Sequence, residues 1–277
     1  MNEKDEENLH SIGSYARHLG VTPDFLKHYE RYHLVTSETQ ENGYRYYPFA
    51  QTFRLMECLK LRNLSVPVRE MDMLLNHSSL DEVTQYMEDR TSQIRRQIRF
   101  QETVLREYGQ FTQWLHRMEN KKENWTIVED QEFFFLPHTQ GRRFLEDPRI
   151  YDILGGWTDC MPIVKSCMQF ETDASFMTCP KYWGFIVPQA DALALEIPVN
   201  DVVEHVHIGK AIMHSFAELP IDRKGESRLL EHVFSRMRAM HLIPYRHAYK
   251  TMFMSTHIDT AAQHYGFYLI PFTEHML

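Results

Sequence analysis

The sequence predicts an α+β protein of several domains: an all-α winged helix-turn-helix head, a long coiled-coil helix, and a duplicated strand-helix-strand-strand domain. Three observations lead to this prediction. Two short helical patterns and an Asn-Gly hairpin signal stand near the N-terminus. From Leu80 to about Lys121 there is no glycine or proline except Gly109, which favours one long helix. Beyond Glu123, strand-type runs alternate with helical ones. A chain of 277 residues, 43% of them hydrophobic, is long enough for two domains.

The first helix of the head is predicted to follow Ser11, which can cap it. Ile12, Ala16 and Leu19 recur at spacings of four and three, which places them on one apolar face. Gly20 supplies the left-handed backbone position at which such a helix ends.

The second helix begins at Pro23, with Thr22 as its N-cap. A polar stripe faces one way and an apolar face the other; the stripe consists of Asp24, Lys27, His28 and Arg31, and the apolar face of Phe25, Leu26 and Tyr29. A short helix with a cationic, hydrogen-bonding stripe fits the major groove of DNA. A charged stripe alone is also explained by a solvated helix face.

A wing behind this helix favours the DNA interpretation. A short strand over Val35 to Thr39 is followed by Asn42-Gly43 and a return strand over Tyr44 to Tyr47, a strong hairpin signal. On the return strand Arg45 and Tyr47 should point to one face, where they suit contact with phosphate groups. A helix over Phe49 to Leu64, with Phe53, Met56 and Leu59 inside, and another over Pro67 to Leu75 complete the head.

This arrangement resembles the DNA-binding domain of the MerR family of transcription regulators. The family's Arg-Tyr-Tyr-Glu appears as Lys27-His28-Tyr29-Glu30, and its Gly-x-Arg-x-Tyr wing as Gly43 to Tyr47. The resemblance implies binding to promoter DNA as a dimer at a pseudo-palindromic operator, with distortion of the DNA that lets RNA polymerase engage. Because lysine lacks arginine's bidentate fork, the operator sequence is left open. We expect DNA contacts from Ser11, Tyr15, Arg17, Thr22, Lys27, His28, Tyr29, Arg31, Arg45, Tyr46 and Tyr47.

The long helix carries a heptad-type pattern. Its predicted seam is mostly apolar and consists of Val83, Met87, Arg90, Ile94, Gln97, Gln101, Val104, Tyr108, Phe111, Leu115 and Met118. A helix of this length between two domains has no obvious partner in its own chain, so we expect a homodimer. The alternative is a single helix packed on its own domain. The family resemblance implies an antiparallel two-helix coil.

The chain's net negative charge lies in its first residues and in its last domain. The net charge of −8 divides into −3 for an acidic tail (1–8), +1 for the DNA-binding head (9–75), +1 for the dimerisation helix (76–122) and −7 for the remaining domain (123–277). A near-neutral head predicts modest non-specific DNA affinity and dependence on dimerisation. Four cysteines without a CxxC pair, and no apolar run long enough for a membrane span, predict a cytoplasmic protein that does not associate with membranes.

The last domain is predicted to contain an antiparallel sheet. Strands are expected over 125–138, 181–187, 203–216, 246–257 and 263–272, with helices near 148–170 and 227–240. The order strand-helix-strand-strand appears twice, which indicates a duplicated module.

This domain is similar to the GyrI-like effector-binding domain, and the whole chain to the multidrug-responsive, BmrR-like type of MerR regulator. The resemblance implies a small aromatic or hydrophobic ligand bound between the halves, near a buried carboxylate that follows a tyrosine. Here Lys250 follows Tyr249, which would disfavour cationic ligands unless Glu196 or Glu204 takes the role. The expected effector-binding residues are Tyr182, Trp183, His214, Phe216, Tyr245, Tyr249, Lys250, Tyr265 and Tyr268.

No catalytic, metal or cofactor site is predicted. The sixteen histidines include His205 and His207 on one strand face, but the cysteines that metal sensors of the MerR family use are missing between Lys121 and Pro137. No nucleophile–base pair stands out by spacing. The sequence therefore predicts a ligand-responsive regulator; the alternatives are a GyrI-like small-molecule hydrolase and a drug-sequestering protein with a DNA-binding head.

Overall fold

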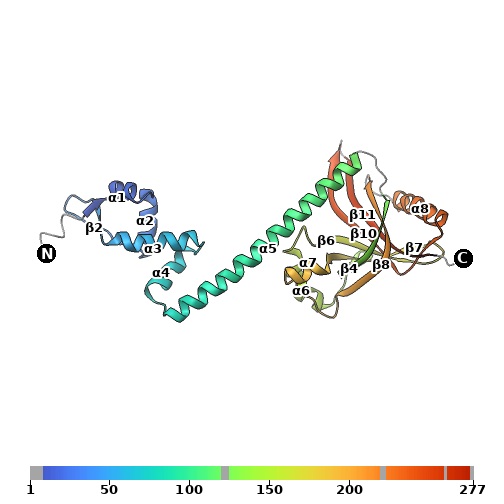
Figure 1. The fold of residues 1–277 in the computed structure, drawn as a ribbon, viewed down its shortest axis with the longest axis horizontal. Helices are drawn as coiled ribbons and strands as arrows, with labels where there is room; N and C mark the ends of the chain where they lie inside the picture. The colour runs from blue at the N-terminus through green and yellow to red at the C-terminus, as the bar shows by residue number, and fades with distance from the viewer. Residues whose placement is uncertain (1–8, 120–124, 219–222, 259–260, 275–277) are drawn as a thin grey trace. The chain divides into compact units, whose positions relative to one another are not determined.

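The computed structural model describes residues 9–119, 125–218, 223–258 and 261–274. Contacts divide the chain into two units, Met1–Gln93 and Ile94–Leu277 (Figure 1). The predicted acidic tail and the end of the long helix near Lys121 lie outside the described residues. None of the helices in the described part of the chain is long and apolar enough to cross a membrane.

The first unit contains short helices around a small sheet. Its elements are β1 (Leu9–Ser11), α1 (Ile12–His18), α2 (Pro23–Arg31), β2 (Glu38–Thr39), β3 (Arg45–Pro48), α3 (Gln51–Asn63) and α4 (Val68–Asn76). The three strands pair in the order β1-β3-β2, so the wing's return strand is central.

Local signals set the boundaries of the first two helices, as predicted. Gly20 has a φ of +68°, a conformation that glycine adopts without a steric penalty. The Thr22 side chain accepts a hydrogen bond from the Phe25 backbone N–H and caps α2. Ser11 precedes α1, but its side chain makes no cap hydrogen bond.

The core of the first unit corrects one expectation. The buried face of α3 is formed by Leu55, Cys58 and Leu61, whereas Phe53 is 71% exposed. Met56 is exposed as well, so the prediction that these two side chains point inward was wrong. Both faces of α3 carry apolar side chains at helical spacing, and the packing of α1, α2 and α4 selects one of them.

A single 40-residue helix, α5 (Leu80–Glu119), contains residues of both units. In the first unit, Val83, Tyr86 and Met87 pack against the core of the head. In the second unit, Phe100 and Val104 pack against a cluster of the strand-rich domain. Three residues of the predicted seam, Val83, Met87 and Val104, thus pack against partners within their own chain.

The second unit is built from long antiparallel strands with helices on the outside. Its elements after α5 are β4 (Trp125–Gln140), β5 (Arg143–Phe144), α6 (Pro148–Thr158), β6 (Lys165–Thr172), β7 (Thr178–Pro188), α7 (Gln189–Ala194), β8 (Glu204–Glu218), α8 (Arg223–Ala239), β9 (Leu242–Pro244), β10 (His247–Ile258) and β11 (Ala261–Glu274).

The predicted helix over 148–170 was wrong in its second part. Residues 165–172 form a strand between β7 and β10, with Cys167 and Gln169 buried on one face.

Six of these strands close into a ring in the order β10-β6-β7-β4-β8-β11, because β10 also pairs with β11. Each half supplies the order strand-helix-strand-strand, as β4-α6-β6-β7 and as β8-α8-β10-β11. The first strands of the halves pair with each other, and so do their second strands, β6 with β10. The predicted duplication and the α+β fold class are confirmed, and the ring has an approximate two-fold axis through these two seams.

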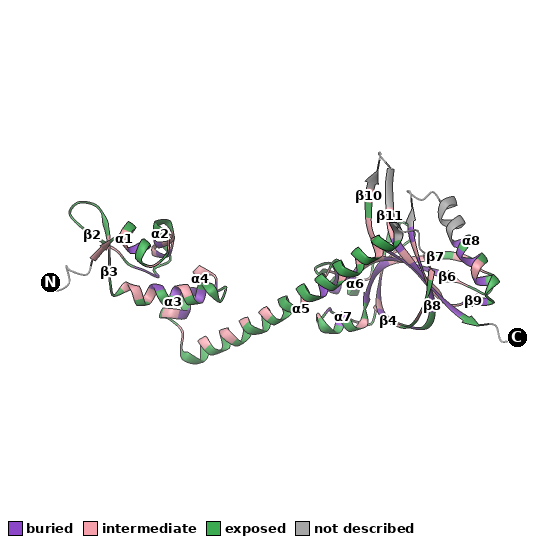
Figure 2. Ribbon diagram, turned by 45° about the horizontal axis from the view of Figure 1, so that its top comes forward, coloured by how far each residue is buried: buried purple, intermediate pink, exposed green. Residues whose placement is uncertain are grey.

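Many residues of the barrel strands are buried (purple in Figure 2). Inside lies a cluster that includes Phe133, Phe135, Tyr249 and Leu269. Outside, α6 and α7 cover one side through residues such as Trp157, and α8 covers another through residues such as Phe234. Buried positions therefore occur at nearly every residue of several strands, rather than at alternate ones.

Candidate functional site

The exposed polar stripe of α2 is the expected DNA-reading surface of the head. Lys27 and Arg31 are exposed, whereas His28 is half-buried against the ring of Tyr32. The Lys27 ammonium lies 3.1 Å from the Asp24 carboxylate, and Arg31 donates a long hydrogen bond to the Lys27 carbonyl. Leu26 and Tyr29 are buried on the opposite side of α2, as predicted.

The wing is tied to this helix by an ion pair. The Arg45 guanidinium donates to the Glu30 carboxylate at 2.9 Å. Gly43, with a φ of +76°, closes the turn, and Asn42 donates to the Tyr46 hydroxyl. The Arg45 side chain is still half exposed, so the wing presents a positioned cation beside the α2 stripe.

Three of the residues expected to contact DNA are core residues. Tyr15, Tyr29 and Tyr47 are only 2%, 3% and 0% exposed. The rings of Tyr15 and Tyr47 stack at 5.1 Å, and the Tyr15 hydroxyl is hydrogen-bonded to Thr52. These tyrosines hold the wing against the helices. The exposed members of the expected set are Ser11, Arg17, Thr22, Lys27, Arg31 and Arg45, with His28 and Tyr46 half-buried.

A cavity of about 510 Å³ opens at the end of the barrel that α5 covers. We call it the α5 cavity. All six ring strands and α5 contribute to its lining. Its aromatic side chains are Phe111, Trp114, Phe133, Phe253 and Phe267. The rings of Trp114 and Phe253 meet edge to face at 5.5 Å, and the ring of Phe111 lies 5.7 Å from that of Phe253. Such a lining suits a flat aromatic ligand.

Two polar contacts fix α5 over this cavity. The Trp114 indole N–H donates to the Ser215 hydroxyl at 2.9 Å. The Lys165 ammonium lies 2.5 Å from the Glu107 carboxylate, and the two side chains are only 15% and 11% exposed. A second carboxylate, that of Glu132, and the Arg117 guanidinium also line the cavity. The charges therefore balance.

Four of the expected effector-binding residues lie elsewhere, on the outer face of the sheet near α8. Phe216 and Tyr268 belong to the cluster beneath α8, with ring centroids 5.1 Å apart. Lys250 is 4% exposed, and its ammonium lies over both of these rings. His214 is buried near His232 and Arg236. Lys250 thus lies on the opposite face of β10 from Tyr249 and lines neither the α5 cavity nor the cavity that Tyr249 lines.

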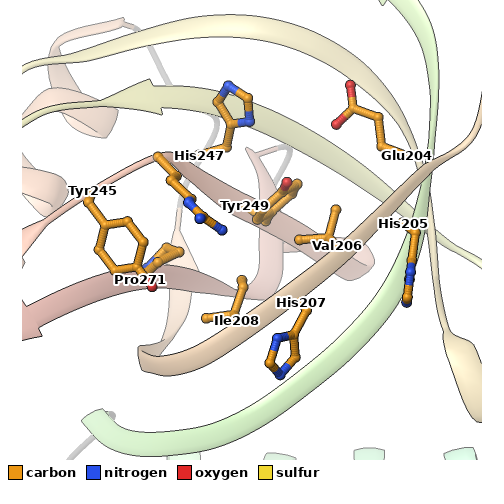
Figure 3. A pocket seen from close by; sticks show the side chains of 10 residues that line it. Glu204, His205, Val206, His207, Ile208, Tyr245, His247, Tyr249 and Pro271 are labelled. Atoms are coloured by element: carbon orange, nitrogen blue, oxygen red, sulfur yellow. The ribbon is translucent and has the colours of Figure 1, made fainter.

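The remaining expected residues are divided among several places. Tyr265 contacts Trp114 edge to face at 5.9 Å, beside the α5 cavity. Trp183 packs on His138 and donates to Ser166, while Tyr182 lies at the edge of the barrel's inner cluster. Tyr245 and Tyr249 line a second cavity of about 400 Å³ (Figure 3).

Sequence reasoning missed the α5 residues of the cavity. Glu107, Phe111 and Trp114 follow each other at steps of four and three, which places them on one face of the helix. This spacing could have predicted a shared face of the helix, but it is equally typical of a coiled-coil seam. Among the described residues, no group of three or more histidines, cysteines or acids is arranged to hold a metal ion.

A family comparison decides the nature of the first unit. Residues 10–78 match the model of the MerR HTH family regulatory protein. These residues form a MerR-family helix-turn-helix domain. The chain is 38% identical over 74 residues to the transcriptional regulator BrlR of Pseudomonas aeruginosa, an alignment that covers 26% of this chain and 27% of that protein. It is 28% identical over 98 residues to the multidrug-efflux transporter 2 regulator of Bacillus subtilis, covering 34% and 35%.

The similarity to these two regulators spans only about a quarter to a third of their lengths. A solved structure, the EcmrR–DNA complex in EcmrR-RPo, aligns with 96% of this chain and 100% of its own, at 13% identity and a TM-score of 0.42. The family match thus identifies the head as a MerR-type domain and does not extend to the barrel.

Proposed function

We propose that this protein is a ligand-responsive, dimeric transcription regulator whose effector, a small aromatic molecule, binds in the α5 cavity. The observation that carries the proposal is the course of α5. Its first turns pack on the MerR-type head through Tyr86 and Met87, and its last turns supply Phe111 and Trp114 to the cavity. A ligand that displaces the last turns thus acts on the same helix that packs on the head.

The α5 cavity favours a broad class of effectors rather than one. Five aromatic rings offer stacking surfaces, and such contacts depend little on the ligand's substituents. Glu107 is already paired with Lys165, so a ligand of either charge can find a counter-ion once the pair opens. This supports a multidrug-type sensor for aromatic or hydrophobic molecules.

On the DNA side, the exposed α2 stripe reads base edges while Arg45 contacts phosphate groups. Dimerisation doubles these contacts and fixes their spacing on a pseudo-palindromic promoter site. The regulator acts in the cytoplasm. Effector binding changes the angle between the two heads and thereby distorts the promoter DNA, which acts indirectly on RNA polymerase.

A solvent-facing stripe on α5 supports the dimer. Ile98, Leu105 and Tyr108 are exposed, and with Ile94 and Leu115 they recur at alternating steps of four and three (through Gln101 and Thr112). This stripe lies beside the face that packs on the barrel. We propose that a second copy of α5 covers it.

The effector site is tested by dye binding to the full chain. A cationic rhodamine and the anionic anilinonaphthalene sulfonate are titrated against wild type, Phe253→Ala and the control Phe144→Ala, whose ring is exposed on β5. We expect at least one dye to lose about tenfold in affinity with Phe253→Ala alone, since about 1.4 kcal/mol of ring contact disappears. Equal affinities in all three proteins would refute the site. Recovery of the dye unchanged separates a sensor from a hydrolase.

The wing is tested with Arg45→Ala, using Arg143→Ala on β5 as the matched control. Loss of one phosphate contact per protomer should weaken binding to all DNA sequences alike and reduce the salt dependence of the affinity by about one ion per contact. Fluorescence anisotropy at several salt concentrations measures both. An unchanged salt slope would remove Arg45 from the interface.

A further inference from the structure

The approximate two-fold symmetry of the ring exchanges the two ends of the barrel. It relates β4 to β8, β6 to β10 and β7 to β11. The α5 cavity lies where β4 and β6 start and β7 ends. The equivalent place at the other end, where β8 and β10 start and β11 ends, holds the second cavity (Figure 3). The rings of Phe133 and Tyr249, 4.9 Å apart, separate the two.

A hydrogen-bonding network holds two lining residues of the second cavity, Glu204 and Tyr249. The Gln169 amide group donates to the Glu204 carboxylate at 2.8 Å and to the Tyr249 hydroxyl at 3.3 Å. Gln169 is fully buried, and its carbonyl oxygen Oε1 has no hydrogen-bond partner among the described residues. Burial raises the pKa of Tyr249, so its hydroxyl keeps its proton. Gln169 is not itself a lining residue, but its hydrogen bonds hold two residues that are, Glu204 and Tyr249, and the Glu204 carboxylate can accept hydrogen bonds from a ligand's ammonium group.

The outer rim carries positive charge. Arg246, in a left-handed backbone conformation with a φ of +61°, lines the cavity with its guanidinium 5.5 Å from the Tyr245 ring centroid. The Lys181 ammonium lies 3.2 Å from His247, which also lines the cavity. Burial and the Lys181 charge lower the pKa of His247, so its imidazole is neutral at neutral pH. Glu171 lies 3.8 Å from Lys181 and offsets part of its charge, which leaves Arg246 as the main cation of the rim.

We propose that the second cavity binds a small zwitterion of amino-acid size with an apolar side chain. Its ammonium group meets the Glu204 carboxylate, and its carboxylate meets the Arg246 guanidinium. Val206 and Tyr245 offer apolar surface for the side chain. An anion alone would face the Glu204 carboxylate, and a cation alone would face Arg246. A molecule that carries both charges pairs with both of these lining residues.

Binding is measured by calorimetry on the full chain without DNA, so the result does not depend on the proposed regulatory function. The probes are L-phenylalanine, phenethylamine, which lacks the carboxylate, and 3-phenylpropionate, which lacks the ammonium group. We expect L-phenylalanine to bind at least about tenfold more tightly than either analogue, since each lost charged hydrogen bond costs roughly that factor. Equal affinity of an analogue, or no binding of any probe at roughly 10 mM, would overturn the proposal.

Two variants locate the site, each with a matched control on the same barrel. Glu204→Gln should weaken L-phenylalanine about tenfold and leave phenylpropionate unweakened, whereas Arg246→Ala should weaken L-phenylalanine and leave phenethylamine unchanged. Glu129→Gln and Arg143→Ala, at exposed positions, should change neither. Arg246 is exposed, so its variant tests the proposal even if Glu204→Gln fails to fold. Binding of all probes unaffected by both variants would refute it.

Discussion

The ion pair between Glu107 and Lys165 gives the sharpest test of how α5 is held on the barrel. Its two side chains are mostly buried, and Lys165 also lies 3.5 Å from the Ile163 carbonyl. Lys165→Met keeps the apolar stem of the side chain but removes the ammonium group. The Glu107 carboxylate is then left in a cavity lined by aromatic rings, without its partner.

The expected cost is about 3 kcal/mol, the lower end of the range for breaking a buried pair, because both groups retain some exposure to water. Glu107→Gln should cost about 2 kcal/mol, since the lysine keeps a carbonyl contact. The double variant, which carries neither charge, should lose only about 1 kcal/mol relative to wild type. The pair should therefore show strong coupling in a double-mutant cycle.

Thermal unfolding followed by circular dichroism measures these differences for the second unit. For a domain of its size, about 3 kcal/mol corresponds to a fall in Tm of roughly 6–12 °C. The matched control is Lys210→Met, which breaks the exposed pair with Glu274 at 2.8 Å and should change Tm by less than about 2 °C. If the single variants cost no more than this control, or if their effects add in the double variant, the pair does not fasten α5.

Two further predictions concern the dimer and the response to pH. Leu105→Glu on the exposed α5 stripe should raise the dimer dissociation constant by about 100-fold, since both copies lose an apolar contact. Analytical ultracentrifugation measures this constant. An unchanged dimer, or an equal effect of the off-stripe control Gln113→Glu, would exclude this stripe. Burial, with His232 and Arg236 nearby, lowers the pKa of His214 from its ordinary 6.5 to about 4. The unfolded chain takes up this proton as pH falls through 6.5 and the folded chain does not, so stability should fall by about 3 kcal/mol between pH 6.5 and 4. Urea titrations should show a smaller fall in His214→Leu; an identical fall would mean that other groups cause it.

Much of the head was predictable because its signals are local. The Thr22 cap, the left-handed Gly20 and the Gly43 turn each depend on a few neighbouring residues. The inward face of α3 was not predictable, because two of its faces carry apolar side chains and only tertiary contacts choose Leu55 over Phe53. For the same reason, the tyrosines of the recognition motif could not be divided into core and surface from the sequence.

In the barrel, the alternation of apolar and polar residues does not reveal which side chains point inward. A strand with one solvated face reveals its inward residues by period two, but these strands are buried inside by the barrel cluster and outside by helices. Tyr249 and Lys250, or Phe267 and Tyr268, are therefore equally plausible as inward residues in the sequence and lie on opposite faces in the fold. The expected effector set took members from both faces. It left α5 out, because that helix was assigned to dimerisation and Phe111 to the dimer seam.

The two seams of the ring, β4 with β8 and β6 with β10, have the geometry of an isologous interface between identical subunits. Either half alone would leave two open strand edges, which a second copy of the same half could cover in the same way. The domain can thus be regarded as a homodimer fused into one chain. Because the halves are fused, they need not be identical, and the two ends of the barrel are free to diverge. One end is covered by α5. The other end carries its own set of charges and can change without altering the end under α5.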